Sequence, residues 1–283
     1  MIFRCPRCGQ TSLLDGLCAE CAKGRRYVTK VPKTEGPATL LSDVSVQDVP
    51  RLTMPGFPAL DDSLHGGFVR GSALLLHGGP GIGKSTLALQ LCGRIGRLVP
   101  SLYVTTEQML AHVKMLADRV EVQMDVVYAL ATQNFADVVT SVERLRPAFV
   151  VIDALQNLNL FEPYDGNRMV AVCNGLVRLA RQQTCAVVIV CHETKDETFA
   201  GPRTLEHVVD GMVSLSAAKE DESSVLWTVY SKYRFGPVPY TVALGQHSHG
   251  GFYERYHPAH HTGRADGDRS PRIAAEGTEG AAK

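Results

Sequence analysis

The sequence has no excess of charge of either sign, because its 283 residues carry 29 lysines and arginines against 29 aspartates and glutamates. Overall charge therefore gives no indication of nucleic-acid binding, and any basic surface has to be local. No run of about 18 apolar residues occurs, so the sequence predicts no transmembrane helix. The first residues also lack the apolar stretch of a secretory signal. We therefore expect a soluble, cytoplasmic protein.

The most informative segment is a glycine-rich run, Gly78-Gly-Pro-Gly-Ile-Gly-Lys-Ser85. Its spacing is that of the phosphate-binding loop of P-loop NTPases, and an apolar run precedes it while a helical pattern follows it. In that setting Lys84 reaches the β- and γ-phosphates of ATP, and Ser85 ligates Mg²⁺. A glycine-rich turn with an unrelated lysine is the less favoured alternative. The predicted nucleotide-binding residues of the loop are Gly78, Gly79, Pro80, Gly81, Ile82, Gly83, Lys84, Ser85 and Thr86.

Apolar runs and helical patterns alternate along most of the chain. The predicted buried strands are residues 72–77, 102–105, 126–130, 148–152 and 186–191. The predicted helices are residues 58–64, 86–92, 108–120, 135–145 (with Asn134 as N-cap) and 169–182. This alternation predicts an α/β fold with a mostly parallel, doubly wound sheet. Three later runs, 212–217, 225–232 and 238–244, predict antiparallel strands added at one edge of that sheet.

Four of the eight cysteines form two C-x₂-C pairs near the N-terminus, namely Cys5, Cys8, Cys18 and Cys21. Two such pairs nine residues apart predict one tetrahedral Zn²⁺, held by four thiolates in a small zinc knuckle or ribbon. A redox pair is the alternative, but neither pair lies in a thioredoxin-like β-α-β setting. The other four cysteines lie in apolar patterns and are expected to be buried and free rather than part of a disulfide framework.

These patterns divide the chain into four parts. We expect a zinc-binding domain at 1–30, a linker at 31–50, an ATPase domain at 51–256 and a disordered tail at 257–283. The linker has lysine, proline, threonine and glycine without a clear period, and the tail is dominated by histidine, glycine and charge.

Two acidic residues at the ends of predicted strands are candidates for the chemistry. Asp153 ends an apolar strand that we expect to lie beside the phosphate loop, where its carboxylate would hold Mg²⁺ through water. Glu107 ends another strand and is the predicted catalytic acid that orients or deprotonates the attacking water. A charge at the start of the next helix is the alternative role for Glu107. His192 closes a third strand, as a γ-phosphate sensor or as a structural histidine.

Two cations near the C-terminus and two polar loops complete the set of candidates. Lys232 and Arg234 lie two residues apart, so a strand places them on one face, near a sheet edge, with Tyr233 on the other. From there they would reach the nucleotide of a neighbouring subunit, as an arginine finger does, or form a solvated strand face. The loops 157–168 and 193–203, the second with Lys195 and Arg203, are candidate DNA contacts.

Taken together, these motifs resemble the RadA/Sms family of bacterial recombination ATPases, within the RecA-like P-loop superfamily. The resemblance runs from Cys5 to about Phe252. It is carried by the zinc motif, Gly66-Gly67 with Gly71-Ser72, the phosphate loop, residues 103–107, 151–156 and 200–210, and Lys232-Tyr-Arg-Phe-Gly236. It implies an ATP-driven homo-oligomeric ring, expected to be a hexamer, that binds single-stranded DNA and processes recombination intermediates by branch migration.

The same resemblance implies a role for each site residue. Lys84 and Ser85 would bind nucleotide and Mg²⁺, Glu107 would be the catalytic acid, and Asp153 the acid on the second side of Mg²⁺. Lys232 and Arg234 would act across a subunit interface.

The sequence departs from the family pattern in two respects. Tyr233 stands where the family motif has asparagine, and the chain ends before the Lon-like C-terminal domain that the family usually carries. Both departures favour a second hypothesis, a nucleotide-gated binding module whose zinc knuckle recruits a recombinase or helicase. A clock-type or signalling ATPase of the same superfamily is a third, but those proteins lack the zinc motif. Stimulation of ATP turnover by single-stranded DNA distinguishes the first hypothesis from the second.

Overall fold

The computed structural model describes residues 40–43, 45, 49–160, 167–192, 205–218 and 224–255, and the backbone of 3–4, 11–12 and 28–29. The predicted zinc ligands Cys5, Cys8, Cys18 and Cys21 lie outside these residues, as do Lys195, Arg203 and the tail 257–283. The three short N-terminal strands, β1 (Phe3–Arg4), β2 (Thr11–Ser12) and β3 (Val28–Thr29), pair in the order β2-β1-β3.

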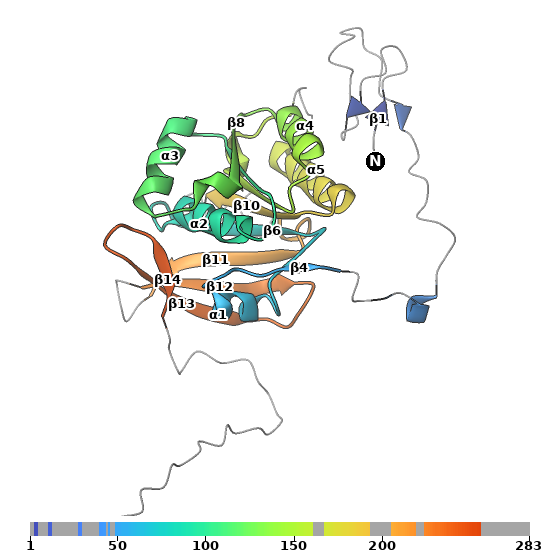
Figure 1. The fold of residues 1–283 in the computed structure, drawn as a ribbon. Helices are drawn as coiled ribbons and strands as arrows, with labels where there is room; N and C mark the ends of the chain where they lie inside the picture. Colours follow the sequence, from blue (N-terminus) through green and yellow to red (C-terminus); the bar gives the residue numbers. More distant parts are fainter. Residues whose placement is uncertain are drawn as a thin grey trace, which may run out of the picture.

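The core is a nine-stranded sheet of order β14-β13-β12-β11-β6-β10-β9-β7-β8 (Figure 1). Its parallel strands are β6 (Ala73–Gly78), β7 (Ser101–Thr105), β8 (Val127–Ala131), β9 (Phe149–Asp153), β10 (Ala186–His192) and β11 (Gly211–Ala217). Its antiparallel strands are β12 (Ser224–Tyr233), β13 (Tyr240–Gln246) and β14 (Phe252–Glu254). The prediction of a mostly parallel sheet with antiparallel strands at one edge is therefore confirmed.

Helices cover both faces of the sheet, as the alternating sequence pattern predicted. The helices are α1 (Pro58–Ser63), α2 (Lys84–Gly96), α3 (Leu110–Arg119), α4 (Phe135–Leu145) and α5 (Arg168–Gln183), with 3-10 turns η1 (Leu41–Asp43), η3 (Met124–Val126) and η4 (Leu155–Asn157). Side chains alternate along β6, so Leu74 and Leu76 pack with α2 and α3, whereas Ala73 and Leu75 pack with α4 and α5. Asn134 caps α4 as predicted, since its side chain accepts a hydrogen bond from the backbone N–H of Ala136 at 3.0 Å.

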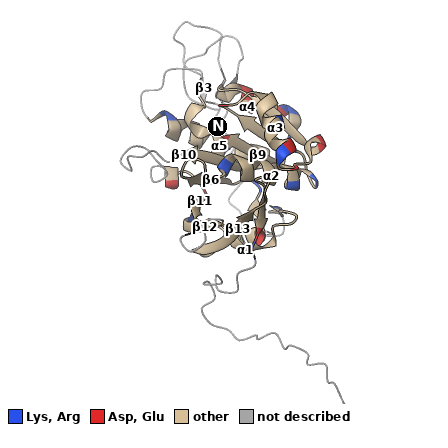
Figure 2. Cartoon of the chain, turned by 90° about the vertical axis from the view of Figure 1, so that its left-hand side faces the viewer, with Lys and Arg blue, Asp and Glu red and all other residues tan. Residues whose placement is uncertain are grey.

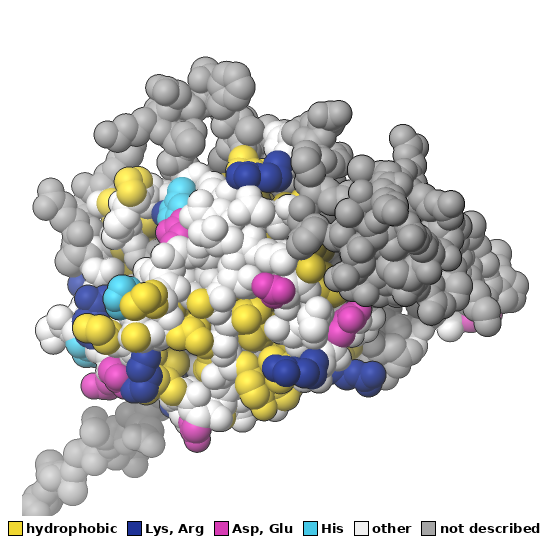
Figure 3. Space-filling view, turned by 90° about the horizontal axis from the view of Figure 1, so that it is seen from above, with side chains coloured by type: hydrophobic (Ala, Val, Ile, Leu, Met, Phe, Trp, Pro, Cys, Tyr) yellow, Lys and Arg dark blue, Asp and Glu magenta, His cyan; other side chains and the backbone are white. Residues whose placement is uncertain are grey.

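Three predictions about the sheet were wrong. The strand at 126–130 was expected to be buried, but β8 is the last strand of the sheet, beside β7. Tyr128 is therefore 51 % exposed, and hydrophobic side chains appear on the surface when the molecule is seen from above (Figure 3). The strand β11 was expected to be antiparallel, but it runs parallel to β6. The strand β9 was expected beside β6, but β10 lies between them.

Three short strands between residues 51 and 255 were not predicted. Two of them, β4 (Arg51–Leu52) and β5 (Phe68–Val69), form a separate antiparallel pair, and the third is β14. A strand of two or three residues is too short to show an alternating pattern in the sequence.

A smaller layer forms where α1 packs against the antiparallel strands. Trp227 is 1 % exposed, and its indole N–H donates a hydrogen bond to Ser63 Oγ at 3.0 Å. Tyr233 is 7 % exposed, and its hydroxyl donates to the carbonyl oxygen of Leu64 at 2.9 Å. Figure 2 shows this layer at one end of the molecule and α3, α4 and α5 at the other, with charges of both signs on the chain. Tyr233 thus belongs to the core.

Four described cysteines outside the zinc motif are buried and form no disulfide, as expected, namely Cys92, Cys173, Cys185 and Cys191. Burial raises the pKa of the thiols of Cys173 and Cys185 to about 12, so they remain protonated at neutral pH. In the described part of the chain, no helix is both long and apolar enough to span a bilayer.

Candidate nucleotide-binding site

The phosphate loop joins the end of β6 to the start of α2. Gly83 precedes the first residue of α2 with φ of +99°, a conformation that residues with a side chain rarely adopt. A Cβ atom on Gly83 would also lie 2.5 Å from the ring of Phe252, which is too close. A glycine is therefore required here. The loop ends at the N-terminus of a 13-residue helix, whose first N–H groups have no partner within the helix. This end of α2 suits an anion.

Lys84 is the first residue of α2, and its side chain reaches back to the loop. It is only 4 % exposed, and its ammonium donates hydrogen bonds to the carbonyl oxygens of Gly78 at 2.7 Å and Gly79 at 2.8 Å. The burial and these two bonds hold the charge at the phosphate end of the loop. Phosphate oxygens are stronger acceptors than amide carbonyls, so Lys84 is placed to exchange these bonds for bonds to a bound phosphate.

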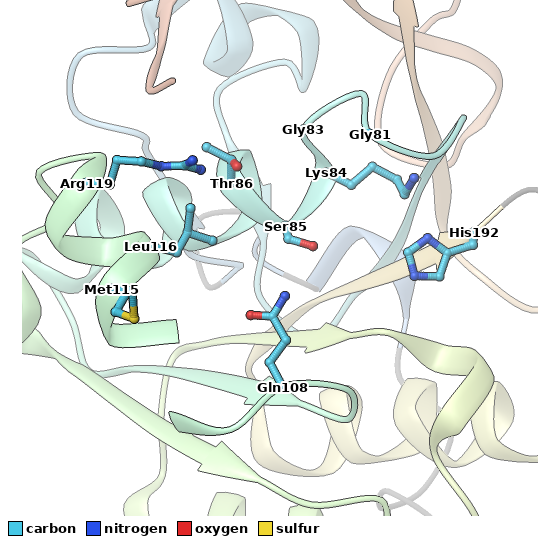
Figure 4. A pocket seen from close by; sticks show the side chains of 10 residues that line it. All are labelled: Gly81, Gly83, Lys84, Ser85, Thr86, Gln108, Met115, Leu116, Arg119 and His192. Atoms are coloured by element: carbon cyan, nitrogen blue, oxygen red, sulfur yellow. The ribbon is translucent and has the colours of Figure 1, made fainter. Parts of the chain in front are cut away.

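A pocket of about 480 Å³ opens beside the loop (Figure 4). Its walls come from the loop and α2, from α3 and the turn before it, and from the end of β10. The lining residues are Gly81, Gly83, Lys84, Ser85, Thr86, Gln108, Met115, Leu116, Arg119 and His192. Figure 4 shows Arg119 at one end, His192 at the other, and the Gln108 amide directed toward the Ser85 hydroxyl.

The pocket brings together five of the nine loop residues predicted to bind nucleotide, and His192. Gly78, Gly79, Pro80 and Ile82 are not part of the lining; Ile82 instead packs against the hydrophobic core. The other lining residues were not predicted from the sequence; they are Gln108, Met115, Leu116 and Arg119. Met115 and Arg119 are four residues apart, which places them on one face of a helix, but that spacing alone does not identify what the face contacts.

Glu107 lies at the carboxyl edge of the sheet, in the turn between β7 and α3. Its Oε1 atom is 3.3 Å from His192 Nε2 and accepts a hydrogen bond from Asn157 Nδ2 at 2.9 Å. Glu107 is not itself among the lining residues, but His192, which contacts it, and Gln108, which follows it in the chain, both line the pocket. The structure thus brings the predicted catalytic acid to the phosphate end of the pocket. Asn157 is a further functional candidate, which the sequence had indicated only as the first residue of a loop.

Asp153 lies deeper than Glu107, at the end of β9. It is 7 % exposed, and its Oδ2 atom accepts a hydrogen bond from the hydroxyl of Tyr103 at 2.5 Å. Burial, with the Asp153 charge second, raises the pKa of Tyr103 well above its ordinary value, so Tyr103 remains a neutral donor. Asp153 is not among the residues that line the pocket. The Ser85 hydroxyl and this carboxylate are oxygen donors of the kind that Mg²⁺ takes.

Lys232 and Arg234 lie at the opposite end of the sheet from the phosphate loop. Tyr233, between them, is in register with Gly211, and Gly211 is in register with Leu74 near the start of β6. The phosphate loop begins at Gly78, which is four residues further along β6, or about 13 Å away. The strand β12 is also internal to the sheet, although these cations had been expected near its edge.

Both cations have partners within the chain. Lys232 Nζ donates a hydrogen bond to the carbonyl oxygen of Glu206 at 2.5 Å, and Arg234 Nη1 lies 2.7 Å from Asp210 Oδ1. Partial burial, and then the charge of Arg234, lower the pKa of Lys232. Neither side chain lines the pocket of its own chain.

Comparisons with known proteins give the family of this chain. A family described as "AAA domain" matches residues 41–198. The chain is 34% identical over 271 residues to the DNA repair protein RadA of Brucella abortus, and 37% identical over 220 residues to that of Escherichia coli K12. These alignments cover 90% and 76% of this chain but 56% and 45% of the relatives. The chain therefore spans about half the length of the curated relatives it matches.

Among solved structures, the ATPase domain of another protein is similar, with a TM-score of 0.59 at 19% identity. The match covers 73% of this chain and 93% of that one, and at this identity it supports the fold alone. The phosphate loop, the sheet order and the sequence relatives all lead to one classification. The chain belongs to the RadA/Sms family of P-loop ATPases, with a RecA-like fold.

Proposed function

We propose that this protein is an ATP-hydrolysing DNA repair and recombination protein whose turnover is stimulated by single-stranded DNA, as a branch-migration motor requires. The observation that carries the proposal is the pocket that joins the phosphate loop, with Lys84 and Ser85, to the Glu107–His192 pair. The relatives named as DNA repair proteins support the DNA-related part of the proposal.

In this proposal the N-terminus of α2 and the ammonium of Lys84 bind the phosphates of ATP. Ser85 and Asp153 would hold Mg²⁺, which neutralises charge on the phosphates when it is bound. Glu107 accepts a proton from the attacking water, because a carboxylate at the phosphate end of the pocket is the base within reach of it. His192, on the same side, is suited to respond to the γ-phosphate. Met115 and Leu116 offer an apolar surface for the nucleoside.

Lys232 and Arg234 would act on the nucleotide of a neighbouring subunit. Their distance from the pocket of their own chain supports this role, because in a ring the far end of one sheet is free to meet the pocket of the next copy. The proposal therefore includes a homo-oligomeric ring, expected to be a hexamer. A matched test mixes Arg234→Ala subunits with Lys84→Ala subunits. If each variant alone is inactive, partial recovery of turnover in the mixture supports action across the interface.

The N-terminal region would form a separate zinc-binding domain at 1–30, joined by a linker at 31–50 to the ATPase domain at 51–256. Cys5, Cys8, Cys18 and Cys21 would hold one structural Zn²⁺. The measurement is the metal content of the purified protein, with about one zinc per chain expected and less than about half of that in the Cys5→Ser variant. A wild-type protein that carries almost no zinc would contradict the proposal.

The deciding experiment is ATP hydrolysis with and without single-stranded DNA at two salt concentrations. We expect DNA to stimulate turnover and salt to weaken that stimulation, because phosphate contacts release counterions. Lys84→Ala and Glu107→Gln should abolish turnover, with nucleotide binding retained in the second, and Lys114→Ala on the exposed face of α3 serves as the control. Nucleotide binding without DNA stimulation would instead favour the nucleotide-gated module that recruits a recombinase or helicase.

A further inference from the structure

The backbone around Glu107 is held firmly, but its carboxylate depends on two neighbours. The N–H groups of Glu107 and Gln108 donate to Thr105 Oγ1 at 3.4 and 3.0 Å. The Thr106 hydroxyl is bonded to the backbone of Ala154 at 2.8 and 2.9 Å. The Glu107 side chain, by contrast, is 39 % exposed and is free to change rotamer unless another group holds it.

The shorter of the two contacts to the carboxylate comes from Asn157. A carboxylate only accepts hydrogen bonds, so the group that faces it at 2.9 Å is the side-chain amide N–H₂ of Asn157. The contact from His192 is longer, at 3.3 Å, and it reaches the same oxygen, Oε1. Within the described residues, Oε2 of Glu107 accepts no hydrogen bond, which leaves one oxygen of the carboxylate available for a proton.

Asn157 is presented by a rigid part of the fold. It is the last residue of η4, between Leu155 and Leu158, which are 0 % and 1 % exposed. Its own carbonyl oxygen accepts a hydrogen bond from Asn159 Nδ2 at 3.1 Å. The preceding residue, Gln156, donates to the carbonyl oxygen of His192 at 2.9 Å and so joins η4 to the end of β10. The amide therefore has a fixed position relative to the sheet.

We propose that Asn157 is a positioning residue for catalysis, which holds Glu107 Oε1 so that Oε2 is directed to the attacking water. The inference rests on the proposed function, since it requires Glu107 to be the base. An amide is well suited to this task, because it stays neutral and a donor at every pH at which the protein is folded. The proton transfer is ordinary general-base catalysis: water loses a proton to Oε2, its oxygen bonds to the γ-phosphorus, and the bond from that phosphorus to the β,γ-bridging oxygen breaks, so that ADP leaves and phosphate is formed.

Two substitutions at Asn157 distinguish a residue that positions Glu107 from one that only fills space beside it. Asn157→Ala removes the donor, and kcat for ATP should fall about tenfold, as expected when a catalytic group is no longer held in one geometry. Asn157→Asp keeps the shape but sets two carboxylates against each other, so kcat should fall further. The KM for ATP should stay within about twofold in both, because Asn157 does not line the pocket. Asn174→Ala, on the exposed side of α5, is the matched control and should leave kcat unchanged.

Thermal unfolding tests the contact between Asn157 and Glu107 independently of ATP turnover. Asn157→Asp should lower the Tm in the wild-type background, because it faces the Glu107 carboxylate. In the Glu107→Gln background the new carboxylate meets an amide that can donate to it, so the same substitution should lower the Tm much less. Equal losses of Tm in the two backgrounds, or a kcat of Asn157→Ala within about twofold of the wild type, would overturn the positioning role.

The role of Glu107 as the base and the role of Asn157 in positioning it can be tested separately. If Glu107→Gln abolishes turnover while Asn157→Ala leaves kcat unchanged, Glu107 stands as the base and the inference about Asn157 is wrong. If Glu107→Gln turns over ATP at the wild-type rate, the base has been misassigned, and the role of Asn157 is overturned with it.

Discussion

The carboxylate of Asp210 accepts a hydrogen bond from Arg234 Nη1 at 2.7 Å, at the end of the sheet opposite the phosphate loop. The same carboxylate is 3.3 Å from Arg181 Nη2 and accepts from the backbone N–H of Ala73 at 3.0 Å. One buried acid thus connects α5, β6 and the segment that follows β12. The side chain of Arg234 remains 46% exposed, so Asp210 sets its position without enclosing it.

Replacement of Asp210 by asparagine should lower the free energy of unfolding by about 1–3 kcal/mol, because it removes charge-assisted bonds to two arginines around a buried site. This expected loss of stability is small because the side chains of both arginines are about half exposed, where solvent screens their charges. Urea unfolding measures it. Asp118→Asn, which breaks the exposed pair with Lys114, should change stability by less than about 1 kcal/mol. Equal effects of the two substitutions would contradict the assignment of Asp210 as a buried structural centre.

Replacement of Tyr233 by phenylalanine should cost about 1 kcal/mol, since it removes the buried hydrogen bond to Leu64 and leaves that carbonyl oxygen without this donor. Turnover of ATP should be unchanged, because the Tyr233 hydroxyl faces the core rather than the pocket. The measurement is urea unfolding together with an ATPase assay. Tyr128→Phe on the exposed edge strand is the control, with no expected change. Loss of turnover without loss of stability would instead show that Tyr233 couples its strand to DNA or to the neighbouring subunit.

Replacement of Lys84 by alanine should abolish the stabilisation of the protein by ATP and Mg²⁺. In the wild type, nucleotide at about a hundredfold above its Kd adds about 2.7 kcal/mol to the free energy of unfolding. A thermal-shift titration measures the effect, and Lys114→Ala should behave as the wild type does. A Lys84→Ala protein that still gains the full shift would place the nucleotide elsewhere.

Stability should depend on pH through Asp61. Burial raises the pKa of Asp61 from 3.8 to about 6; the N–H of Met54 opposes this shift, and Glu254 and Asp62 add to it. Between about pH 4 and pH 6 the folded state therefore holds more protons than the unfolded state. Its free energy of unfolding should fall as the pH rises through that window.

Asp61→Asn should make the stability curve flatter between about pH 4 and pH 6, because the substituted side chain cannot lose a proton. The pKa of Glu254 is also raised, chiefly by burial, so some slope of the same sign should remain. Urea unfolding at about pH 4.5 and about pH 7 measures the difference. A wild-type curve that rises over this window, with no change in the variant, would contradict the prediction.

Local patterns in the sequence were enough for much of the site. The phosphate loop was predictable because a glycine-rich turn between an apolar strand and a helix has one common use. Asn134 was predictable as a cap because an N-cap is set by its own short segment. Glu107 was predictable as a residue at the carboxyl edge of the sheet, since parallel strands end at the same edge.

Contacts between distant segments were not predictable in this way. The bond from Asn157 to Glu107 joins residues 50 positions apart, and its existence depends on β9 and β7 being neighbours in the sheet. The exposure of β8 and the parallel direction of β11 depend equally on strand order, which a run of apolar residues does not encode. The internal partners of Lys232 and Arg234 come from the segment before β11, 26 and 24 residues earlier.

Local sequence patterns were sufficient to identify the phosphate loop, the alternation of strands and helices and the family to which the chain belongs. Each of these features depends on residues that are close together in the chain, so backbone geometry and the periodicity of the side chains determine it directly. Three-dimensional packing, by contrast, sets which acid contacts which amide, which carboxylate binds which cation and which strand lies at the edge of the sheet. Those relations depend on how the sheet is ordered, and this order follows from the packing of the whole core rather than from any one segment.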